Sequence, residues 1–456
     1  MCGILLYFSN NHQKTIAELL DQNNLIQHRG QDCLGFLYSN NLNLEYCSVN
    51  SVKGIISNYK NDLIKYSKCN LFLSHLRYKT SGPKSNIRVQ PVVSKNKFGD
   101  FAFVFNGNIP KMSYESEYQD ITVDTDLVLN FILQKATTTS SWDELLKEFV
   151  LRFKRSFSMI LVTNENIYIV KDRYAVRPLC YAITNNTLEI CSETCGISLT
   201  NTEINELDSG TVLKIIVNED NTLKSELVFK LDYQNAICLF EMIYFMSPKS
   251  KWYENSITDL RNSWGIELAK KDIDFLNQDY IAIGIPSSGI IPGKSYASHL
   301  KLPYKQAIVK NKKINRTFIL SEQERDKISK QKYIYDEEVI SGKRVIIIDD
   351  SIVRGITMNN IVSKLFSLGA KEVHIRICAP EVKDVCYFGI NINSKDELVS
   401  STKNVEEVNN MFKSTSLRFL NIDLMLSHIS NSINNKMCSG CFNSDYRQEC
   451  NKFIDW

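Results

Sequence analysis

The sequence contains no long hydrophobic stretch. Its most apolar segment, residues 237–246, is short and includes Glu241, and no basic segment followed by an apolar one opens the chain. A membrane-spanning helix needs about 20 consecutive apolar residues, and a secretory signal needs that basic-then-apolar order. We therefore expect no membrane partner and a cytoplasmic protein.

The sequence also lacks a strong net charge, an internal repeat and a flexible linker. Lys and Arg number 54 against 51 for Asp and Glu, so the formal charge is only +3. Such a weak field gives no reason to expect a nucleic-acid partner. Because no stretch is rich in Gly/Ser or Pro, the domains of the chain are expected to pack tightly and not to swing freely.

Two domains are expected because 456 residues exceed what one hydrophobic core usually organises. Short β-type runs such as residues 71–76 dominate the first half of the chain. In the second half, continuous apolar strands such as residues 280–285 and 345–348 alternate with helices, which is typical of a parallel sheet covered on both faces. This change in the predicted secondary structure indicates one domain over residues 2–235 and another over residues 236–456.

Local patterns also predict helices. Apolar residues at helical spacing indicate one over residues 125–135, and Ser141 with Glu144 forms a capping-box pattern at the start of the next. In the second half, helices are expected over residues 295–299 and 359–366. The first pair lies among the β-type runs, and the second pair lies between the apolar strands.

Thirteen cysteines are present, which is a high and odd number. Without a secretory signal, disulfides are not expected, so catalysis or metal binding is favoured. Cys2 follows Met1 directly, and a small second residue allows Met1 to be removed, which would leave the thiol and the α-amine on one residue. The amine has a pKa of about 7.7–8.0 against about 8.5 for the thiol, so it can act as the base that activates Cys2. No catalytic histidine is then required, and we interpret His28 and His75 as structural.

Three motifs follow Cys2. Residues 28–36 read HRGQDCLGF, residues 74–82 read SHLRYKTSG, and residues 105–108 read FNGN. Their order and spacing resemble those of class II glutamine amidotransferases, which release ammonia from glutamine with an N-terminal cysteine nucleophile. A cysteine at position 2 carries little weight by itself, but four such features in one order favour this family.

Glutamine hydrolysis requires a guanidinium for the substrate carboxylate, an acid for its ammonium group, and donors for the oxyanion formed when the thiolate attacks. The resemblance implies that Arg77 binds the carboxylate and Asp124 the ammonium group. It also implies an oxyanion hole made by the Asn106 side chain and the Gly107 N–H. Taken singly, Asn106-Gly107 is also a turn dipeptide, and Arg77 would equally suit a surface ion pair.

The segment over residues 345–357, VIIIDDSIVRGIT, is the most specific in the chain. A buried strand ends in Asp349 and Asp350, and a loop with hydroxyls and a glycine leads into the helix expected near Asn359. Ligands of open α/β sheets bind outside the carboxyl ends of the strands, and a helix N-terminus offers N–H donors to phosphate. The segment therefore indicates a phosphate site, with a metal-only acid pair or a plain turn as alternatives.

This segment resembles the signature of type I phosphoribosyltransferases. The resemblance implies that the two acids hold the ribose hydroxyls, directly or through Mg²⁺, and that residues 351–357 wrap the 5′-phosphate. Residues 285–289, IPSSG, stand at the family's pyrophosphate loop, where several relatives carry an acid in place of Ser287. The implied contacts to phosphoribosyl pyrophosphate are Asp349, Asp350, Ser351, Arg354, Gly355, Thr357, Ser288, Gly289 and Lys310, with Ser288, Asp349 and Asp350 also on Mg²⁺.

Lys310 also opens a segment that resembles the family's flexible loop, which covers the substrate and completes an ammonia channel. Residues 310–311 and 316–319 match its start, and the match loosens after Gln323 and Arg325. The lysines further along would suit either a cationic lid over the diphosphate or a solvated loop: Lys327, Lys330 and Lys332.

Both motif sets together resemble the amidophosphoribosyltransferase family over almost the whole chain, with residues 171–179 and 192–195 as further landmarks. The resemblance implies an α/β fold, an N-terminal αββα sandwich followed by a parallel-sheet type I phosphoribosyltransferase domain. It implies that glutamine and phosphoribosyl pyrophosphate give 5-phosphoribosylamine, glutamate and pyrophosphate, the first committed step of de novo purine synthesis. Purine nucleotides are the expected inhibitors, and a homotetramer or homodimer is the expected assembly.

Cysteines near the C-terminus indicate a further centre. Cys438 and Cys441 are spaced as ligands for zinc or an iron–sulfur cluster, although two ligands do not complete a site. Cys238 and Cys386 match the remaining ligand positions of the family's cluster-containing branch. The resemblance thus implies one 4Fe-4S cluster, with a structural role because this chemistry transfers no electrons. Zinc or plain buried thiols are the alternatives.

Two departures keep other functions open. Residues 247–249 read SPK where the family commonly has Arg-Pro-Asp, which bears on interdomain coupling and nucleotide regulation. With Ser287, this change motivates a non-catalytic paralogue that binds phosphoribosyl pyrophosphate or nucleotides. A class II amidotransferase with another acceptor is the second alternative. Intact Cys2 and Arg77 oppose the first alternative, and the acid pair of residues 349–350 opposes the second.

Overall fold

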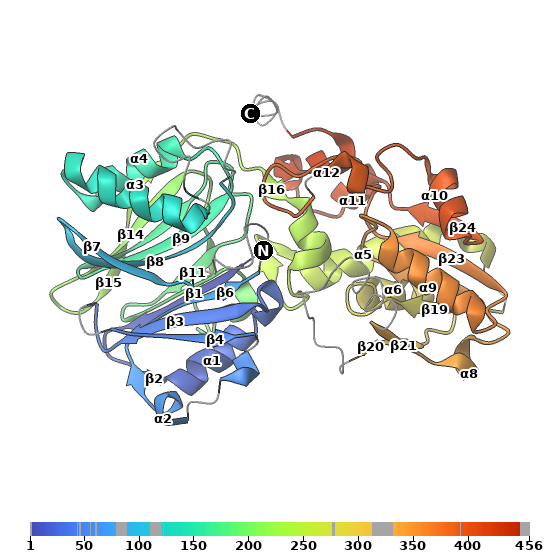
Figure 1. Cartoon of the computed structure of the whole chain (residues 1–456), viewed down its shortest axis with the longest axis horizontal. Coiled ribbons are helices and arrows are strands. Elements are labelled where there is room, and N and C mark those ends of the chain that lie inside the picture. The colour runs from blue at the N-terminus through green and yellow to red at the C-terminus, as the bar shows by residue number, and fades with distance from the viewer. Residues whose placement is uncertain are drawn as a thin grey trace.

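The computed structural model describes residues 2–42, 44, 47–54, 56–59, 62–78, 89–109, 121, 123–275, 279–311, 332–392 and 394–446. Figure 1 shows two bodies side by side, the N-terminal half and the C-terminal half, with the N-terminus where they meet. Among the described residues, no helix is both long and apolar enough to cross a membrane.

The N-terminal body consists of two facing antiparallel sheets with helices outside them (Figure 1). α1 (Ile16–Asn24) covers one sheet, and α3 (Asp124–Thr138) and α4 (Trp142–Arg152) cover the other. The sheet under α1 runs, in order, β13 (Asn205–Glu206), β11 (Cys180–Ile183), β12 (Thr187–Cys191), β1 (Gly3–Ser9), β6 (Leu71–Arg77), β3 (Cys33–Ser39) and β4 (Ser48–Lys53). The other runs β15 (Leu223–Lys230), β14 (Thr211–Val217), β10 (Asn166–Lys171), β9 (Phe157–Thr163), β8 (Gly99–Gly107) and β7 (Val92–Asn96).

The central strands of this sandwich are buried on both faces, which explains their continuous apolar sequence. In β9, Met159 and Leu161 pack into the layer beneath α3 and α4, whereas Ile160 and Val162 pack between the sheets. Successive side chains of a strand alternate between faces, so a strand covered on both sides needs apolar residues at every position. The predicted αββα sandwich is confirmed.

The C-terminal body is built on a parallel sheet. Its described strands are β19 (Tyr280–Gly284), β22 (Arg344–Asp349), β23 (Glu372–Ile377) and β24 (Ser416–Phe419), in that order. A short antiparallel pair, β20 (Ile308–Lys310) and β21 (Tyr333–Tyr335), lies beside it. Helices flank the sheet: α5 (Ile257–Lys270), α6 (Ile290–His299), α9 (Ile356–Ser367) and α10 (Val405–Phe412). The predicted parallel α/β domain is confirmed.

Two predicted helices begin earlier than expected. α6 begins at Ile290, so residues 295–299 form only its second half, and α9 begins at Ile356, ahead of Asn359. The capping box of α4 is only half formed. Ser141 Oγ accepts the Glu144 N–H at 3.2 Å, but the Glu144 carboxylate accepts the Ser140 N–H at 2.7 Å.

The two bodies share a hydrophobic core where the chain passes between them. β16 (Ile237–Cys238) pairs in parallel with β25 (Met437–Cys438). The Cys238 N–H also donates to the Val176 carbonyl at 3.1 Å, and Val176 packs in the same apolar cluster as the second body's strands. The tight packing predicted from the missing linker is therefore observed. Apart from short 3-10 turns, the other described elements are β2 (Lys14–Thr15), α2 (Asp62–Lys65), β5 (Lys68–Cys69), a π-helical turn (Glu241–Phe245), β17 (Lys251–Trp252), β18 (Asn255–Ser256), α8 (Glu337–Ile340), α11 (Ile422–Leu426) and α12 (Gly440–Asn443).

Candidate active sites

Cys2 lies at the start of β1, between its neighbours β12 and β6. Burial by itself raises the pKa of the Cys2 thiol, but the adjacent His75, through its charge and a hydrogen bond, lowers this pKa to about 6. Such a thiol is largely thiolate at neutral pH and therefore nucleophilic. His75, which we interpret as structural, therefore lies in the immediate surroundings of the nucleophile.

Asn106 presents an unpaired amide group beside Cys2. Its Oδ1 accepts the Cys2 N–H at 3.2 Å and Arg177 Nη1 at 2.7 Å. Its Nδ2 is buried and has no hydrogen-bond partner in the described part of the chain. An unsatisfied buried donor costs about 1–3 kcal/mol, so its retention beside a nucleophile indicates a use for it. The amide NH₂ is therefore available to a substrate oxygen.

Gly107 ends β8 next to Asn106. The Asn108 N–H donates to the Ser156 carbonyl, in the direction of β9, at 3.1 Å. Because N–H directions alternate along a strand, the Gly107 N–H points away from β9. A Cβ at this position would overlap the Phe105 ring and lie 2.8 Å from the Phe157 Cβ, so the position requires glycine.

Two charged residues lie near this thiol as the sequence predicted. Arg77 ends β6, and Asp124 is the first residue of α3. Burial and the charge of Cys2 raise the pKa of Asp124 to about 6, against the opposing effect of Arg177 and Arg77. These effects place Cys2, Arg177 and Arg77 each within electrostatic reach of Asp124. A thiol, a carboxylate and two guanidinium groups thus lie in one region.

If Asp124 binds the ammonium group of glutamine, as the resemblance implies, its pKa predicts a pH dependence for glutamine binding. Only the carboxylate can pair with the substrate ammonium group, and this carboxylate is protonated as the pH falls through about 6. We expect the KM for glutamine to rise steadily below pH 6, measured from pH 5 to pH 8. Asp124→Asn protein should show a high KM without this pH dependence. A native KM that stays flat down to pH 5 would contradict the assignment.

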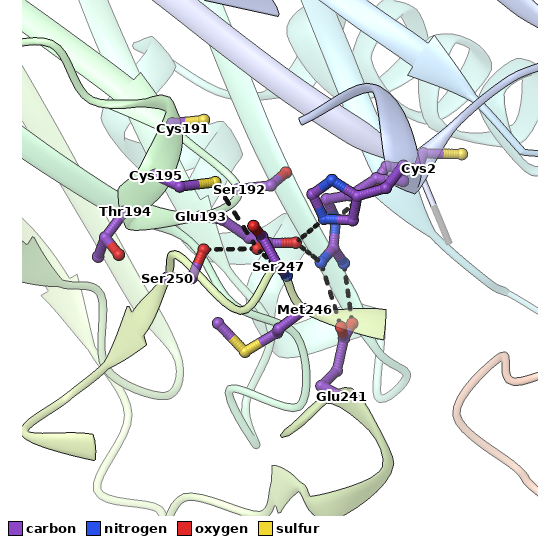
Figure 2. Close-up of polar contacts among 12 residues, drawn as sticks. Cys2, Cys191, Ser192, Glu193, Thr194, Cys195, Glu241, Met246, Ser247 and Ser250 are labelled. Atoms are coloured by element: carbon purple, nitrogen blue, oxygen red, sulfur yellow. Dashed lines mark hydrogen bonds and ion pairs between the residues drawn. The ribbon is translucent and has the colours of Figure 1, made fainter. Parts of the chain in front are cut away.

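A buried ion cluster ties Cys2 to the C-terminal body (Figure 2). Arg29 Nε donates to the Cys2 carbonyl at 3.1 Å, Nη1 contacts Glu193 at 2.5 Å, and Nη2 contacts Glu241 at 2.9 Å. Burial alone would raise the pKa of Glu193, but Arg29 and then His28 outweigh it and hold that pKa well below its usual range. Arg29 and Glu193 stand in motifs singled out from the sequence, but no sequence signal linked them to Glu241.

The altered landmark at residues 247–249 takes part in the same cluster. The Ser247 N–H donates to Glu193 Oε2 at 2.8 Å, and Ser250 Oγ donates to the same oxygen at 2.6 Å. Figure 2 shows both serines directed toward Glu193, with the Cys2 side chain directed away from them. A backbone donor therefore makes the interdomain contact at Ser247.

The predicted acid pair stands at the carboxyl end of β22. Asp349 is the last residue of the strand, and its Oδ1 accepts the Asp350 N–H at 2.9 Å and Ser288 Oγ at 3.1 Å. Burial and the neighbouring Asp350 raise the pKa of Asp349 well above its usual range. Ser351 Oγ donates to Asp350 at 2.6 Å. The pair is thus a concentration of negative charge suited to a cation or to hydroxyl donors.

The loop after the pair leads into α9. Gly355 caps this helix with a φ of +75°, a left-handed conformation that favours glycine. Thr357 follows in the first turn, where helix N–H groups are unpaired and can meet an anion. The Arg354 guanidinium instead pairs with Glu397, with Nε at 2.9 Å from the carboxylate. The Arg354 side chain is therefore engaged by Glu397, and its contact with phosphoribosyl pyrophosphate stays a prediction.

The predicted pyrophosphate loop follows the carboxyl end of β19, the strand next to β22. Gly289 caps α6 so closely against the Ile348 carbonyl that no Cβ fits between them. Lys310 Nζ donates to Ser287 Oγ at 2.7 Å, where several relatives have an acid. Ser288 joins this loop to Asp349. The structure therefore brings Lys310 and both serines to one edge of the sheet.

The four cysteines assigned by resemblance line one cavity, together with Val176, Phe388, Ile390 and Tyr446. The β16–β25 pair sets Cys238 opposite Cys438. Cys386 accepts the N–H groups of Phe388 and Ile390 at 3.4 Å each, as thiolate ligands of clusters do. Among the described residues, no three His, Cys, Asp or Glu side chains are close enough to hold a single metal ion.

Some predicted residues lie outside the described residues. They are residues 79–82 of the second motif, and residues 316–319, Gln323, Arg325, Lys327 and Lys330 of the segment compared with the family's flexible loop. On either side of that segment, the Asn311 N–H donates to the Lys332 carbonyl at 3.0 Å.

Comparison with known proteins gives one consistent result. Residues 75–198 match the glutamine amidotransferase domain family, and residues 265–385 match the phosphoribosyl transferase domain family. The chloroplastic amidophosphoribosyltransferase of Vigna aconitifolia is 31% identical over 98% of this chain and 91% of its own. That of Methanocaldococcus jannaschii is 28% identical over 99% and 98%. The structure of glutamine phosphoribosylpyrophosphate amidotransferase from B. subtilis, complexed with ADP and GMP, superposes with a TM-score of 0.82 at 26% identity, over 98% and 97% of the two chains.

The fold and sites define an enzyme with two linked chemistries, a glutamine amidotransferase that is also a pentosyltransferase. The chain belongs to the amidophosphoribosyltransferase family. Neither alternative, an amidotransferase with another acceptor or a non-catalytic paralogue, is favoured.

Proposed function

We propose that Cys2 hydrolyses glutamine and that the ammonia displaces pyrophosphate from C1 of phosphoribosyl pyrophosphate, giving 5-phosphoribosylamine. The observation that carries this assignment is the unpartnered Asn106 amide beside a thiol of lowered pKa. The thiolate attacks the side-chain amide carbon of glutamine, and Asn106 Nδ2 with the Gly107 N–H binds the resulting oxyanion. The α-amine of Cys2, which removal of Met1 exposes, passes the thiol proton to the leaving nitrogen, and ammonia departs. Water then hydrolyses the thioester to glutamate.

The substrate is held by charge. Arg77 pairs with the glutamine carboxylate and Asp124 with its ammonium group, which positions the amide over Cys2. Arg29 holds the Cys2 backbone through its carbonyl and is itself fixed by Glu241. The nucleophile is therefore anchored to the second body as well as to its own sheet.

In the second half-reaction, Asp349 and Asp350 hold the ribose hydroxyls, while residues 351–357, with Ser351, Gly355 and Thr357, bind the 5′-phosphate. Ser288, Gly289 and Lys310 bind the diphosphate. The carboxylate and hydroxyl oxygens of Asp349, Asp350 and Ser288 suit Mg²⁺, which, when bound, supplies positive charge to the diphosphate. Ammonia forms the C1–N bond as the C1–O bond to pyrophosphate breaks, and the new amine loses a proton. Shielding from water keeps ammonia unprotonated and nucleophilic.

Product measurement tests this scheme. Glutamate and pyrophosphate should form in a one-to-one ratio when glutamine and phosphoribosyl pyrophosphate are both present. Omission of phosphoribosyl pyrophosphate, or its replacement by fructose 6-phosphate or aspartate as acceptor, should abolish pyrophosphate release. Pyrophosphate release that needs no glutamine or ammonia would contradict the scheme.

We also propose that Cys238, Cys386, Cys438 and Cys441 hold a 4Fe-4S cluster. Zinc draws its thiolates to about 2.3 Å from one point, whereas a cluster spreads its ligands around a larger volume. Four cysteines ring one cavity, and their match to the ligand positions of the family's cluster-containing branch favours the cluster over zinc. When bound, the cluster would fasten the C-terminal segment to the start of the second body.

Iron analysis tests the cluster. Protein purified without oxygen should contain about four iron and four sulfide ions per chain and little zinc. Cys441→Ser should lose iron and lower the Tm, because the cluster then no longer links the two strands of the β16–β25 pair. Cys69→Ser, at a buried thiol in the N-terminal body, serves as the matched control and should keep its iron. Zinc without iron in the native protein would refute the proposal.

The same proposal includes the domain boundary, the inhibitors, the cellular compartment and the assembly. The domain boundary lies at residues 235–236, between the end of β15 and the start of β16. Purine nucleotides act as inhibitors, in line with the ADP and GMP complex of the B. subtilis relative. The protein is cytoplasmic and assembles as a homotetramer or homodimer. Serine at position 247 removes the charge of the usual arginine, so nucleotide specificity should differ from that of relatives.

A further inference from the structure

Arg177 is a buried side chain that connects the two bodies. Only 2% of Arg177 is exposed, and its guanidinium donates in three directions. Nε bonds to Ser156 Oγ at 2.9 Å, Nη1 to Asn106 Oδ1 at 2.7 Å, and Nη2 to the Phe388 carbonyl at 3.0 Å. Ser156 and Asn106 belong to the N-terminal sandwich, whereas Phe388 lies in the C-terminal half, two residues after Cys386. One side chain therefore bonds to both the glutamine site and the cysteine-lined cavity.

The direction of the Asn106 amide depends on this contact. If the amide were reversed, its NH₂ group would face the N–H donors of Arg177, and neither could pair. A planar guanidinium offers donors in a fixed fork, so it sets the amide orientation as well as its position. Without Arg177, the only bond to Oδ1 that remains among the described residues is that from the Cys2 nitrogen, at 3.2 Å. That nitrogen must also receive the thiol proton during the reaction.

The guanidinium is held in place from the C-terminal side. Gly389 follows Phe388 and adopts a φ of +93°. A Cβ at Gly389 would collide with Arg177 Nη2 and lie 2.7 Å from the Asn108 Cβ. The backbone carbonyl of Arg177 accepts a hydrogen bond from the buried Lys171 ammonium. The loop and the guanidinium thus pack without space for independent movement.

We propose that Arg177 is a positioning residue for glutamine hydrolysis, which directs the Asn106 amide at the oxyanion and makes this direction depend on the loop over residues 386–390. The inference rests on the proposed role of Asn106 in the oxyanion hole. It assigns the loop that carries Cys386 a second task, which is to support a catalytic amide in the other body.

Arg177→Lys tests the positioning directly. Lysine keeps the charge but cannot make all three bonds, so the amide loses its fixed direction. We expect kcat for glutamine hydrolysis to fall about 10- to 100-fold, because removing an oxyanion donor outright costs about 10²- to 10³-fold. Glutamate, which forms no oxyanion, should inhibit as it does in the native protein. Glutamate γ-semialdehyde, whose carbonyl adds the Cys2 thiol to form a tetrahedral adduct, should bind more weakly by the same factor as kcat.

Gly389→Ala tests the link between the bodies. Its methyl group should displace the guanidinium, so glutamine hydrolysis falls although the change lies in the other half of the chain. Gly342→Ala is the matched control, because Gly342 also has a positive φ, +71°, but a Cβ there meets nothing within 4 Å. Iron content is measured for both variants. Ammonia-dependent pyrophosphate release should be unchanged in Gly389→Ala and Arg177→Lys.

Three outcomes separate this inference from the proposed function. If Asn106→Ala hydrolyses glutamine normally, the oxyanion hole itself is misassigned. If Asn106→Ala is impaired but Arg177→Lys and Gly389→Ala keep the native kcat, only the positioning role fails. If the affinities for glutamate and for the semialdehyde fall equally, the substitution has disrupted the whole site. This outcome would also overturn the positioning role of Arg177. Should Arg177→Lys fail to fold, Ser156→Ala, which removes one bond to the guanidinium, is measured in the same way and is expected to show the same selective loss.

Discussion

Cys2→Ala protein is expected to lose glutamine-dependent formation of 5-phosphoribosylamine by about 10³-fold or more while it still uses added ammonia. The thiol is the only atom of the site that bonds covalently to glutamine, so its loss cannot be offset by Arg77 or Asn106. The second site, at Asp349, needs ammonia and phosphoribosyl pyrophosphate but not the thiol, and it lies in the other body. Pyrophosphate release with glutamine or with ammonium chloride above pH 8, where more free ammonia is present, measures the two activities separately.

A matched variant controls for a general effect of losing a thiol. Cys47→Ala removes a half-buried cysteine outside both sites and should leave both activities intact. Glutamate should still bind to Cys2→Ala, because Arg77 and Asp124 remain. If glutamine supports native rates in Cys2→Ala, another nucleophile must be at work. If ammonia also fails, Cys2 has a role in the phosphoribosyl half that the geometry does not explain.

The sequence predicted the elements of the fold because their signals are local. Residues 345–348 are apolar at every position, and the structure buries all of them in the central parallel strand. The grouping of Asn106, Arg77 and Asp124 with Cys2 was implied by the resemblance to class II glutamine amidotransferases. Helix starts were less accurate, since the start of α9 depends on Gly355 adopting a left-handed conformation, which the sequence pattern alone does not require.

The groups that support the active residues were not predictable in this way. Arg177 bonds to Phe388, 211 positions along the chain, and Arg29 bonds to Glu241, 212 positions away. Periodicity reports on neighbours within one element, so contacts of this separation leave no pattern in it. The effect of His75 on Cys2 was not predicted, for a related reason. Its closeness to Cys2 follows from the pairing of β6 with β1, which sets His75 opposite Ile4.

Asp349→Asn is expected to make the protein more stable and almost inactive. Burial and the adjacent Asp350 raise the pKa of Asp349, so its ionised form costs stability at neutral pH. Asparagine has the same shape, and its Oδ1 can still accept the Asp350 N–H and Ser288 Oγ. The Tm should therefore exceed that of the native protein at pH 8, and the difference should shrink as the pH falls and native Asp349 becomes protonated.

The same change removes half of the charge that is to hold the ribose hydroxyls and Mg²⁺. Ammonia-dependent pyrophosphate release should fall about 10²-fold or more. Glutamine hydrolysis without phosphoribosyl pyrophosphate should persist, because Cys2 lies in the other body. Asp279→Asn is the control, since Asp279 is an exposed acid at the opposite end of the sheet, paired with Lys343. A stabilised but fully active Asp349→Asn would mean that the buried charge is kept for some purpose other than this reaction. Because a folded protein gains nothing by burying two adjacent carboxylates, their cost is best explained by a ligand that needs both.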